Sequence, residues 1–427
     1  MGAITPNMSS LRNPPRHVTF GGIAFVIIVL FVVFTPRSPH MNLPQFHSSA
    51  SSSTPPSSSS STVDTSSNLG SYGSSSKTAE KLYGNDYRGH SSPADINRVT
   101  NSTLGFGKVF VVGLPERTDK RDAITLTSSL TGFHVEWVDG VRGETIPDKA
   151  VPFGADRKKL WENNLGSWRG HMNAVRRIVE EDLDSALIME DDMDWDVRLQ
   201  PQLERVAQGA RALLSSASNP ISPYGDDWDI LWLGHCGEVF PELLDENKNK
   251  PADDAGIKYM QRKFVIENDL TVPPLDKVTG LIDFKSSPEH TRWVHITGAP
   301  ICTFAYALSQ RGARKVLFDL SVDHLTGPFD NSLAGLCRRS VASVGVQDPA
   351  KAGDRGLDAK CISVTPPVFF HHRAKGMMNA DSDIQTGTGG AVREKGYTEN
   401  IVWSARNNIR NMIMGTRMES QYEASSP

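Results

Sequence analysis

Short apolar runs separated by polar stretches predict the secondary structure of the central and C-terminal parts of the chain. The run KVFVVGL, which begins after Gly107, is typical of a buried strand. Residues 118–130 space their apolar positions like one face of a helix, and residues 134–138 read as a second strand. A strand, a helix and a strand in this order open an α/β fold with parallel strands.

The same alternation continues beyond this unit. It predicts a helix over 170–181, strands over 185–189, 229–233 and 303–308, and a helix over 312–318. Residues 241–288 are polar and irregular, which favours an insertion or long surface loops. We expect one folded domain over 105–385, followed by a C-terminal tail over 386–427.

An uncharged apolar run covers residues 18–35 and is long enough to cross a bilayer as a helix. A cleaved signal peptide and a buried core helix are the alternatives. No small-residue cleavage site follows, because Pro36 and Arg37 come next. The residues after the run have the composition of a disordered segment, which argues against a core helix. The run therefore predicts an uncleaved signal-anchor.

The segment over 36–104 is rich in Ser and Pro and reads as a disordered stem. Arg12 and Arg16 precede the apolar run, which weakly favours a cytoplasmic tail over 1–17. Asn101 begins an N-glycosylation sequon, which is used only in the secretory lumen. We expect a type II membrane protein of the Golgi or endoplasmic reticulum, and the short span leans toward the thinner early membranes.

Composition narrows the class of protein. The chain has 427 residues, a formal net charge of -4 and a pI near 6.3. This length permits an enzyme, and the near-neutral charge makes nucleic acid an unexpected partner. Four cysteines lie in the C-terminal part, where they can form up to two disulfides or remain buried free thiols. They are Cys236, Cys302, Cys337 and Cys361.

Three adjacent carboxylates, Glu190, Asp191 and Asp192, follow directly on the strand predicted over 185–189. Ligands of α/β sheets collect at such strand ends. Adjacent carboxylates repel one another unless a cation is present, and Mn²⁺ or Mg²⁺ prefers oxygen ligands while leaving positions for phosphate oxygens. The cluster therefore indicates a metal site that binds the diphosphate of a nucleotide.

Two other interpretations of the acidic cluster stand beside this one. The first is a solvated turn or the N-cap of a following helix. The second is a calcium loop, because Asp194 and Asp196 continue the acidic alternation. The calcium loop fails, since Val197 takes the place of the required Gly and Leu203 that of the closing Glu.

Several sequence blocks follow one another between about residue 108 and about residue 385, and both their sequences and their order are informative. They are VFVVGLPERTDKR (109–121), GFHVEWVDGVRG (132–143), LGSWRGHMNAVRRIVEEDLDSALIMEDD (165–192), ILWLG (230–234), TFAYALSQRGARK (303–315), GPFDNSL (327–333), Pro366-Pro367 and Ser382-Asp383-Ile384. These blocks resemble glycosyltransferase family 25, the family of bacterial lipooligosaccharide glycosyltransferases and procollagen galactosyltransferases. Gly113, Ser167 and Gly170 stand where the family often has Asn, Cys and Ser. No acid is lost, so these departures bear on the choice of donor.

The resemblance implies an α/β fold of the GT-A-like, nucleotide-sugar-binding kind, with Mn²⁺ or Mg²⁺ as cofactor. Asp192 is then the first choice as metal ligand, and Glu190 binds either the metal or the ribose. Asp191 belongs to the nucleotide-sugar site but faces another way. Many GT-A enzymes place a late histidine on the metal, which makes His372, beside His371, a further candidate ligand.

Other candidate residues come from the remaining blocks. Arg117 and Arg121 follow the first strand and are expected to contact the nucleotide or its phosphates, unless they are exposed helix charges. His171 is a candidate substrate contact, although a histidine bonded within the fold is the more frequent case. Asp330 is the expected catalytic base for an inverting transfer, with a helix N-cap as its alternative.

Together these features predict transfer of a hexose from a UDP-sugar to a hydroxyl of a glycan or glycoprotein. Galactose is the favoured hexose. One alternative is a metal-dependent phosphodiesterase or nucleotidyltransferase, which needs a second cluster of His and Asp that we do not find in the sequence. The other is a non-catalytic lumenal glycan-binding protein that retains the fold. Such a protein tolerates loss of the acids, whereas this chain keeps them.

Overall fold

The computed structural model describes residues 98–214, 220–280, 283–346, 348, 350, 353–384 and 391–422. The predicted anchor over 18–35 and most of the predicted stem lie outside these residues. Across the described ranges, none of the helices combines the length and the apolar character needed to span a bilayer. Val99 and Leu104, in the last part of the expected stem, are buried in the core, so the folded part begins before Gly105.

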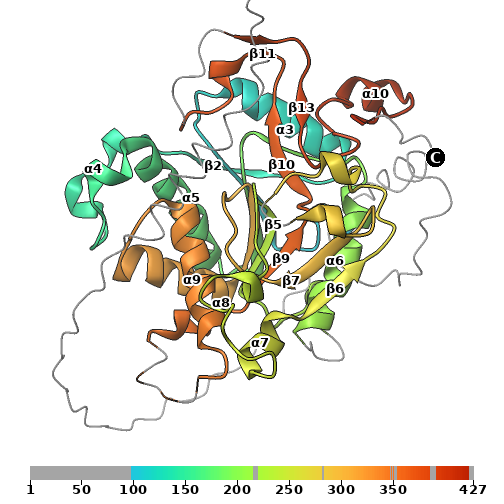
Figure 1. The fold of residues 1–427 in the computed structure, drawn as a ribbon. Helices are drawn as coiled ribbons and strands as arrows, with labels where there is room; N and C mark the ends of the chain where they lie inside the picture. The colour runs from blue at the N-terminus through green and yellow to red at the C-terminus, as the bar shows by residue number, and fades with distance from the viewer. Residues whose placement is uncertain are drawn as a thin grey trace, which may run out of the picture. The chain divides into compact units, whose positions relative to one another are not determined.

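A mixed sheet of eight strands forms the centre of the described part of the chain (Figure 1). The three strands at one edge pair in parallel, as predicted from the opening strand, helix and strand. The middle of the sheet contains antiparallel pairs as well as one parallel pair. In pairing order the strands are β2 (Glu136–Asp139), β1 (Lys108–Gly113), β3 (Ser185–Glu190), β8 (Ala305–Ser309), β5 (Ile230–Gly234), β9 (Cys361–Thr365), β7 (Arg292–Ile296) and β6 (Lys263–Ile266).

Residues along the central strands alternate between two hydrophobic cores. In β3, Leu187 and Met189 face one core, whereas Ala186 and Ile188 face the other. This alternation buries both faces, which explains why the strand reads as one continuous apolar run. Because β1, β3, β5 and β9 run in the same direction, their C-terminal ends meet at one edge of the sheet.

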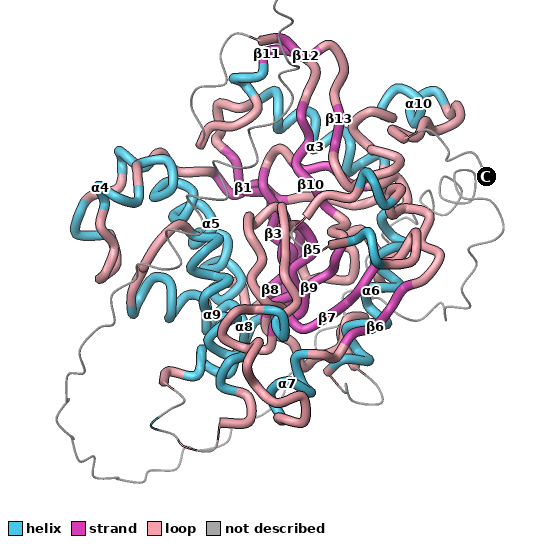
Figure 2. Tube along the Cα trace, in the orientation of Figure 1, coloured by secondary structure: helices cyan, strands magenta, loops and turns pink. Residues whose placement is uncertain are grey.

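Helices cover both faces of the sheet (Figures 1 and 2). One face packs against α3 (Thr118–Leu130) and α6 (Leu199–Leu213). The other packs against α5 (Glu162–Glu180), α8 (Gln310–Leu317), which continues into a π-helix (Phe318–Asp323), and α9 (Phe329–Ser343). The prediction of α3 is confirmed residue for residue, whereas α5 starts earlier than expected.

The stretch over 241–288 is more ordered than its polar sequence suggested. It contains α7 (Ala255–Met260) and the edge strand β6, which pairs with β7. Other short helices within the described ranges are α4 (Arg157–Leu160), α10 (Ile409–Met414) and 3-10 turns over Gly143–Thr145, Asp148–Ala150, Pro241–Leu243, Leu275–Lys277, Phe284–Ser286, Arg355–Asp358 and Met378–Ala380.

The residues after 391, expected to be a tail, fold back onto the domain. Ile401 and Ala405 are buried in the core on the α3 side. A small sheet joins β4 (Met193–Trp195), β10 (Phe369–Arg373) and β13 (Tyr397–Thr398), and a separate pair joins β11 (Gly376–Met377) and β12 (Val392–Arg393). The polar composition concealed this return because much of it is held by hydrogen bonds rather than by apolar contacts.

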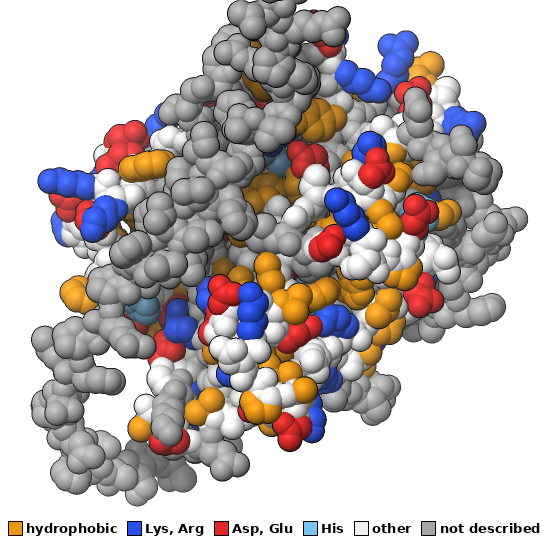
Figure 3. All heavy atoms as spheres, viewed as in Figure 1, with side chains coloured by type: hydrophobic (Ala, Val, Ile, Leu, Met, Phe, Trp, Pro, Cys, Tyr) orange, Lys and Arg blue, Asp and Glu red, His pale blue; other side chains and the backbone are white. Residues whose placement is uncertain are grey.

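All four cysteines form disulfides, which settles the alternative of free thiols. Cys236 pairs with Cys302, and Cys337 pairs with Cys361. On the face shown in Figure 3, acidic and basic side chains lie interspersed over the described surface.

Candidate functional site

The acidic motif lies in a tight turn between β3 and β4, at the sheet edge where the parallel strands end. The three carboxylates diverge from one another. Glu190 accepts a hydrogen bond from Thr303 Oγ1 at 3.1 Å, and Asp191 accepts one from Lys120 Nζ at 2.8 Å. Asp192 instead faces His371, whose Nε2 lies 3.3 Å from Asp192 Oδ2. Each carboxylate of the turn therefore has its own closest partner, and Lys120 Nζ also lies 3.5 Å from Asp192 Oδ2.

Asp192 is partly buried and incompletely satisfied. Among the described residues, neither Asp192 Oδ1 nor His371 Nε2 has a hydrogen-bond partner, although both atoms are buried. Burial opposes ionisation of Asp192, but the charges of His371, Lys120 and Arg406 outweigh it and lower its pKa. Buried polar atoms without partners are rare in folded proteins and need an explanation.

Asp191 is held by its neighbours on the first strand and first helix. A Cβ atom on Gly113 would lie 2.5 Å from Asp191 Oδ2, so only glycine at this position leaves room for the carboxylate. Burial and the charge of Asp192 raise the pKa of Asp191 to about 7, against the opposing effect of Lys120. The departure from Asn at Gly113 thus accompanies this placement of Asp191.

Lys120 is a residue of the site that sequence reasoning missed. Its ammonium lies 2.8 Å from Asp191 Oδ1, 3.5 Å from Asp192 Oδ2 and 3.1 Å from Asp383 Oδ2. Burial would lower the pKa of Lys120, but the carboxylates of Asp192 and Asp191 raise it above its ordinary value. The only local signal was a third cation beside Arg117 and Arg121 at the start of one helix.

The two late histidines point to opposite sides of β10, as alternation along a strand requires. His372 Nδ1 forms a hydrogen bond of 2.9 Å with Thr398 Oγ1 and lies 3.6 Å from Asp194. His371 is the one beside Asp192. The structure therefore corrects the choice of His372 as candidate ligand to His371.

Asp194 and Asp196 serve the fold rather than a metal. Asp194 accepts hydrogen bonds from Thr398 Oγ1 at 2.6 Å and from the backbone N of Arg406 at 3.0 Å. Asp196 accepts one from the backbone N of Trp403 at 3.0 Å. These bonds attach the C-terminal segment beneath the acidic turn.

Arg406 comes from the same C-terminal segment and lies under the acidic turn. Its guanidinium donates to the backbone oxygen of Met193 at 3.1 Å and to that of Asp191 at 3.3 Å. Burial lowers the pKa of Arg406, and the nearby aspartates oppose that effect. Sequence reasoning missed this residue too, because it lies in the presumed tail.

His171 and Asp330 lie near Glu190, on the α5 and α9 side. His171 Nε2 is 3.8 Å from Glu190 Oε1, its Nδ1 is 3.1 Å from the Tyr306 hydroxyl, and its ring stacks on Phe329. Asp330 accepts hydrogen bonds from the backbone N of Asn331 at 2.8 Å and of Cys302 at 3.2 Å. Burial raises the pKa of Asp330, and the charge of Glu190 adds to the rise.

The two predicted arginines diverge. Arg117 bonds Asp119 at 2.8 Å and also pairs with Asp383, so it lies on the side of the acidic turn. Arg121 bonds Asp139, and its guanidinium stacks 4.6 Å from the centre of the Trp137 ring. Arg121 Nη2 also donates to the backbone oxygen of Gly113 at 3.2 Å, at the end of β1. Arg121 is therefore engaged with β2 and the end of β1, and its nucleotide contact stays a prediction.

The donor set fits a hard divalent cation. Within the described ranges, no three His, Cys, Asp or Glu side chains gather closely enough to form a complete cage. Mn²⁺ and Mg²⁺ need no such cage, since one or two protein ligands suffice when substrate phosphates and water complete the shell. The unsatisfied Asp192 Oδ1 and His371 Nε2 are the atoms available for this role.

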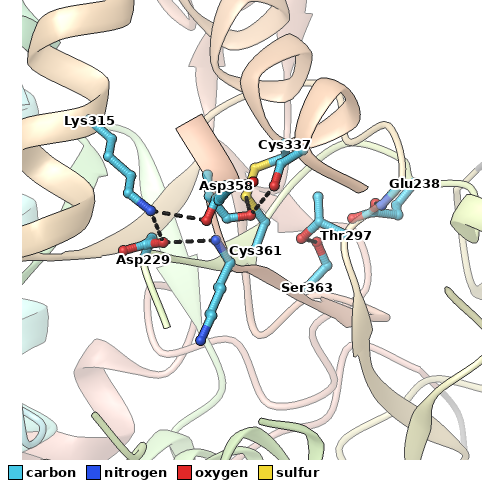
Figure 4. The surroundings of a disulfide bond; sticks show 12 residues. Asp229, Glu238, Thr297, Lys315, Cys337, Asp358, Cys361 and Ser363 are labelled. Atoms are coloured by element: carbon cyan, nitrogen blue, oxygen red, sulfur yellow. Dashed lines mark hydrogen bonds and ion pairs between the residues drawn. A yellow bond between two sulfur atoms is a disulfide. The ribbon is translucent and has the colours of Figure 1, made fainter. Parts of the chain in front are cut away.

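A separate cavity of about 450 Å³ lies at the opposite edge of the sheet, beside the Cys337–Cys361 disulfide (Figure 4). Its lining includes Thr297, Ser340 and Lys360. None of the residues predicted for the functional site lines it.

No protein-family profile matches the chain. Similar curated proteins exist, however. A glycosyltransferase 25 family member of Anopheles gambiae is 25% identical over 203 residues, which make up 43% of this chain and 31% of that protein. Procollagen galactosyltransferase 1 of Danio rerio is 24% identical over 142 residues, or 31% of this chain and 22% of that protein.

A human protein named inactive glycosyltransferase 25 family member 3 is 25% identical over 154 residues, which cover 33% of this chain and 24% of that protein. The chain thus spans less than a third of the length of each of these relatives. They confirm its resemblance to glycosyltransferase family 25, and the mixed α/β architecture fits an α/β glycosyltransferase fold.

Proposed function

We propose that this relative of glycosyltransferase family 25 is a metal-dependent glycosyltransferase with a GT-A-like fold. It transfers a hexose from a UDP-sugar to a hydroxyl of a glycan or glycoprotein, and galactose is the favoured hexose. The observation that carries the proposal is the pair of buried, unsatisfied atoms Asp192 Oδ1, in the turn after β3, and His371 Nε2, on β10. The names of the relatives support the same class of reaction.

Asp192 and His371 would hold Mn²⁺ or Mg²⁺, with Glu190 next to them on the ribose or the metal. The cation would offset the negative charge that develops on the departing diphosphate. Lys120 offsets the charge of both neighbouring aspartates, because its ammonium lies 2.8 Å from Asp191 Oδ1 and 3.5 Å from Asp192 Oδ2. Thr303 orients Glu190 through its hydroxyl.

Asp330 is the proposed base that removes the proton from the acceptor hydroxyl. A general base must lie close to the proton that it removes, with its carboxylate held in one orientation. Two backbone donors fix the Asp330 carboxylate at the start of α9, and burial raises its pKa, which makes the carboxylate more basic. The Cys236–Cys302 disulfide supports this arrangement, because Cys302 provides one of the two donors.

We further propose that the apolar run over 18–35 anchors the chain as a type II protein of the Golgi or endoplasmic reticulum, with the described domain in the lumen. The charge-free composition of the run supports the anchor, and Arg12 and Arg16 before it, together with the sequon at Asn101, support the orientation. Resistance of the full-length chain to extraction from membranes by high salt is the expected behaviour.

The test is an assay of the full-length chain with Mn²⁺ and a panel of nucleotide sugars, scored for both donor hydrolysis and sugar transfer. Asp192→Ala should lower turnover by about 100-fold or more, since it removes a group that acts on developing charge. Asp122→Ala, an exposed acid of α3, is the matched control and should keep full activity. Turnover of no donor, or equal turnover by Asp192→Ala, would contradict the proposal.

A non-catalytic binding protein is the second candidate, because one relative carries the name of an inactive member. Glu190, Asp192 and Asp330 are all retained here, which favours the enzyme. The same panel separates the two: a binding protein shows saturable binding of a nucleotide sugar or glycan by calorimetry, with no product.

A further inference from the structure

Two cations at the start of α3 converge on a single carboxylate oxygen. Arg117 Nη1 pairs with Asp383 Oδ2, and Lys120 Nζ lies 3.1 Å from the same atom. The side chains of Arg117 and Lys120 are 17% and 9% exposed. This arrangement is an anion-binding position built from a guanidinium and an ammonium, and in this structure an acidic side chain occupies it.

Lys120 also connects this position to the acidic turn, through its contacts with Asp191 and Asp192. One ammonium therefore faces three carboxylates. The side chain of Asp383 is 34% exposed, whereas those of Asp191 and Asp192 are 10% and 15% exposed. Of the three, Asp383 is the most accessible to solvent and the least costly to displace, since screening weakens ion pairs near the surface.

We propose that Asp383 competes with the donor for one binding position. Its carboxylate occupies the position between Arg117 and Lys120 until the diphosphate of a nucleotide sugar replaces it. The inference rests on the proposed function and adds to it the side chains that bind the diphosphate. A diphosphate suits the position because it brings more negative charge than one carboxylate and offers several oxygens to a guanidinium and an ammonium.

The place of Lys120 beside Asp192 supports this competition. A divalent cation on Asp192 would repel the Lys120 ammonium, which lies only 3.5 Å from Asp192 Oδ2. A diphosphate that contacts both the cation and the ammonium relieves that repulsion, whereas Asp383 pairs with the ammonium and with Arg117. Donor and cation are therefore expected to bind in a mutually supportive way.

The alternative is that Asp383 only holds its segment in place. Other contacts also hold that segment, because Asn163 Nδ2 donates to the backbone oxygen of Ile384 at 3.0 Å and Arg393 pairs with Asp381 at 2.7 Å. Asp383→Asn keeps the shape of the side chain and removes its charge. The substitution therefore separates competition from simple attachment.

The experiment measures the Kd of UDP by calorimetry on the full-length chain with Mn²⁺. Asp383→Asn should bind UDP about fivefold more tightly than the wild type or better, because the competing charge is gone. Asp381→Asn is the matched control, since this acid of the same segment pairs with Arg393 and not with α3. Its Kd should equal that of the wild type.

Arg117→Gln supplies a second, independent measurement. It should weaken UDP binding and should also abolish most of the gain from Asp383→Asn in the double variant, because the two residues act at one position. An unchanged or higher Kd in Asp383→Asn overturns the inference, as does a gain that Arg117→Gln leaves intact. If the wild type binds UDP but either of these outcomes is found, the inference fails and the proposed function stands. If neither the wild type nor any folded variant binds UDP, both the inference and the proposed function are overturned.

Discussion

Asp192 and Asp229 are carboxylates at opposite edges of the same sheet, and they differ in how well their oxygens are satisfied. Asp229 is fully buried and accepts from Arg311 Nε at 2.6 Å and from the backbone N of Lys360 at 2.8 Å. It also accepts from Lys315 Nζ at 2.8 Å (Figure 4). Asp192 has long contacts at Oδ2 and none at Oδ1 among the described residues.

This difference separates a structural acid from the acid proposed to bind the metal. Charged groups that are paired and hydrogen-bonded tie elements together, and Asp229 joins the starts of β5 and β9 to α8. An acid left with an open buried oxygen costs stability unless a ligand completes it. Burial and charge alone would not distinguish the two, because both residues have cations nearby.

Asp229→Asn should have the largest effect on stability. Loss of the charge leaves Lys315 and Arg311 without their shared partner, and the free energy of unfolding should fall by about 3 kcal/mol. Activity per folded molecule should remain at the wild-type level. Denaturant unfolding, monitored by circular dichroism, measures the free energy of unfolding. Asp192→Asn should show the reverse, with unfolding free energy unchanged or higher, and equal destabilisation by both variants would remove the distinction.

His371→Asn and His372→Asn test which of the two histidines binds the metal beside Asp192. His371→Asn should raise the Kd of Mn²⁺ by about 10-fold or more, because it removes the ring nitrogen that faces Asp192. His372→Asn should leave the Kd of Mn²⁺ unchanged and lower the melting temperature, because its ring bonds Thr398 in the small sheet. Calorimetric titration with Mn²⁺ decides between them. A greater loss of Mn²⁺ binding in His372→Asn would restore the original choice of ligand.

Glu238 sharpens the comparison, because it too has a buried oxygen without a partner among the described residues. Its Oε1 accepts from the backbone N of Gly298 at 2.7 Å, and burial raises its pKa from 4.5 to about 8. Glu238 therefore meets the cost of burial by retaining a proton, whereas Asp192 is held ionised by the cations around it.

Glu238 makes the stability of the fold depend on pH. Between pH 4.5 and about 8 the folded chain holds a proton on Glu238 that the unfolded chain has released, so this group lowers stability as the pH rises. Glu238→Gln should become progressively more stable than the wild type from pH 5 to pH 8, as measured by thermal unfolding at each pH. A constant difference across this range would show that Glu238 does not titrate there.

The parts of the site that the sequence predicted are those that lie close together along the chain. The run over 185–189 and the acids after it define a strand end with carboxylates, and the structure places Glu190 there as the last residue of β3. The start of α3 was likewise readable. Its cation Lys120 was not singled out, because the partner Asp383 lies 263 positions away.

By itself, the sequence determined several strands and helices, among them β1, α3 and β3, the position of the acidic turn and the family that the chain resembles, because periodicity and local motifs depend on neighbouring residues. Tertiary structure alone decided that His371 rather than His372 faces Asp192, that the cysteines pair as they do, and that Ser404 and Arg406 return from the C-terminal segment to support the turn. Each of these depends on residues distant in sequence, whose contacts no local pattern encodes.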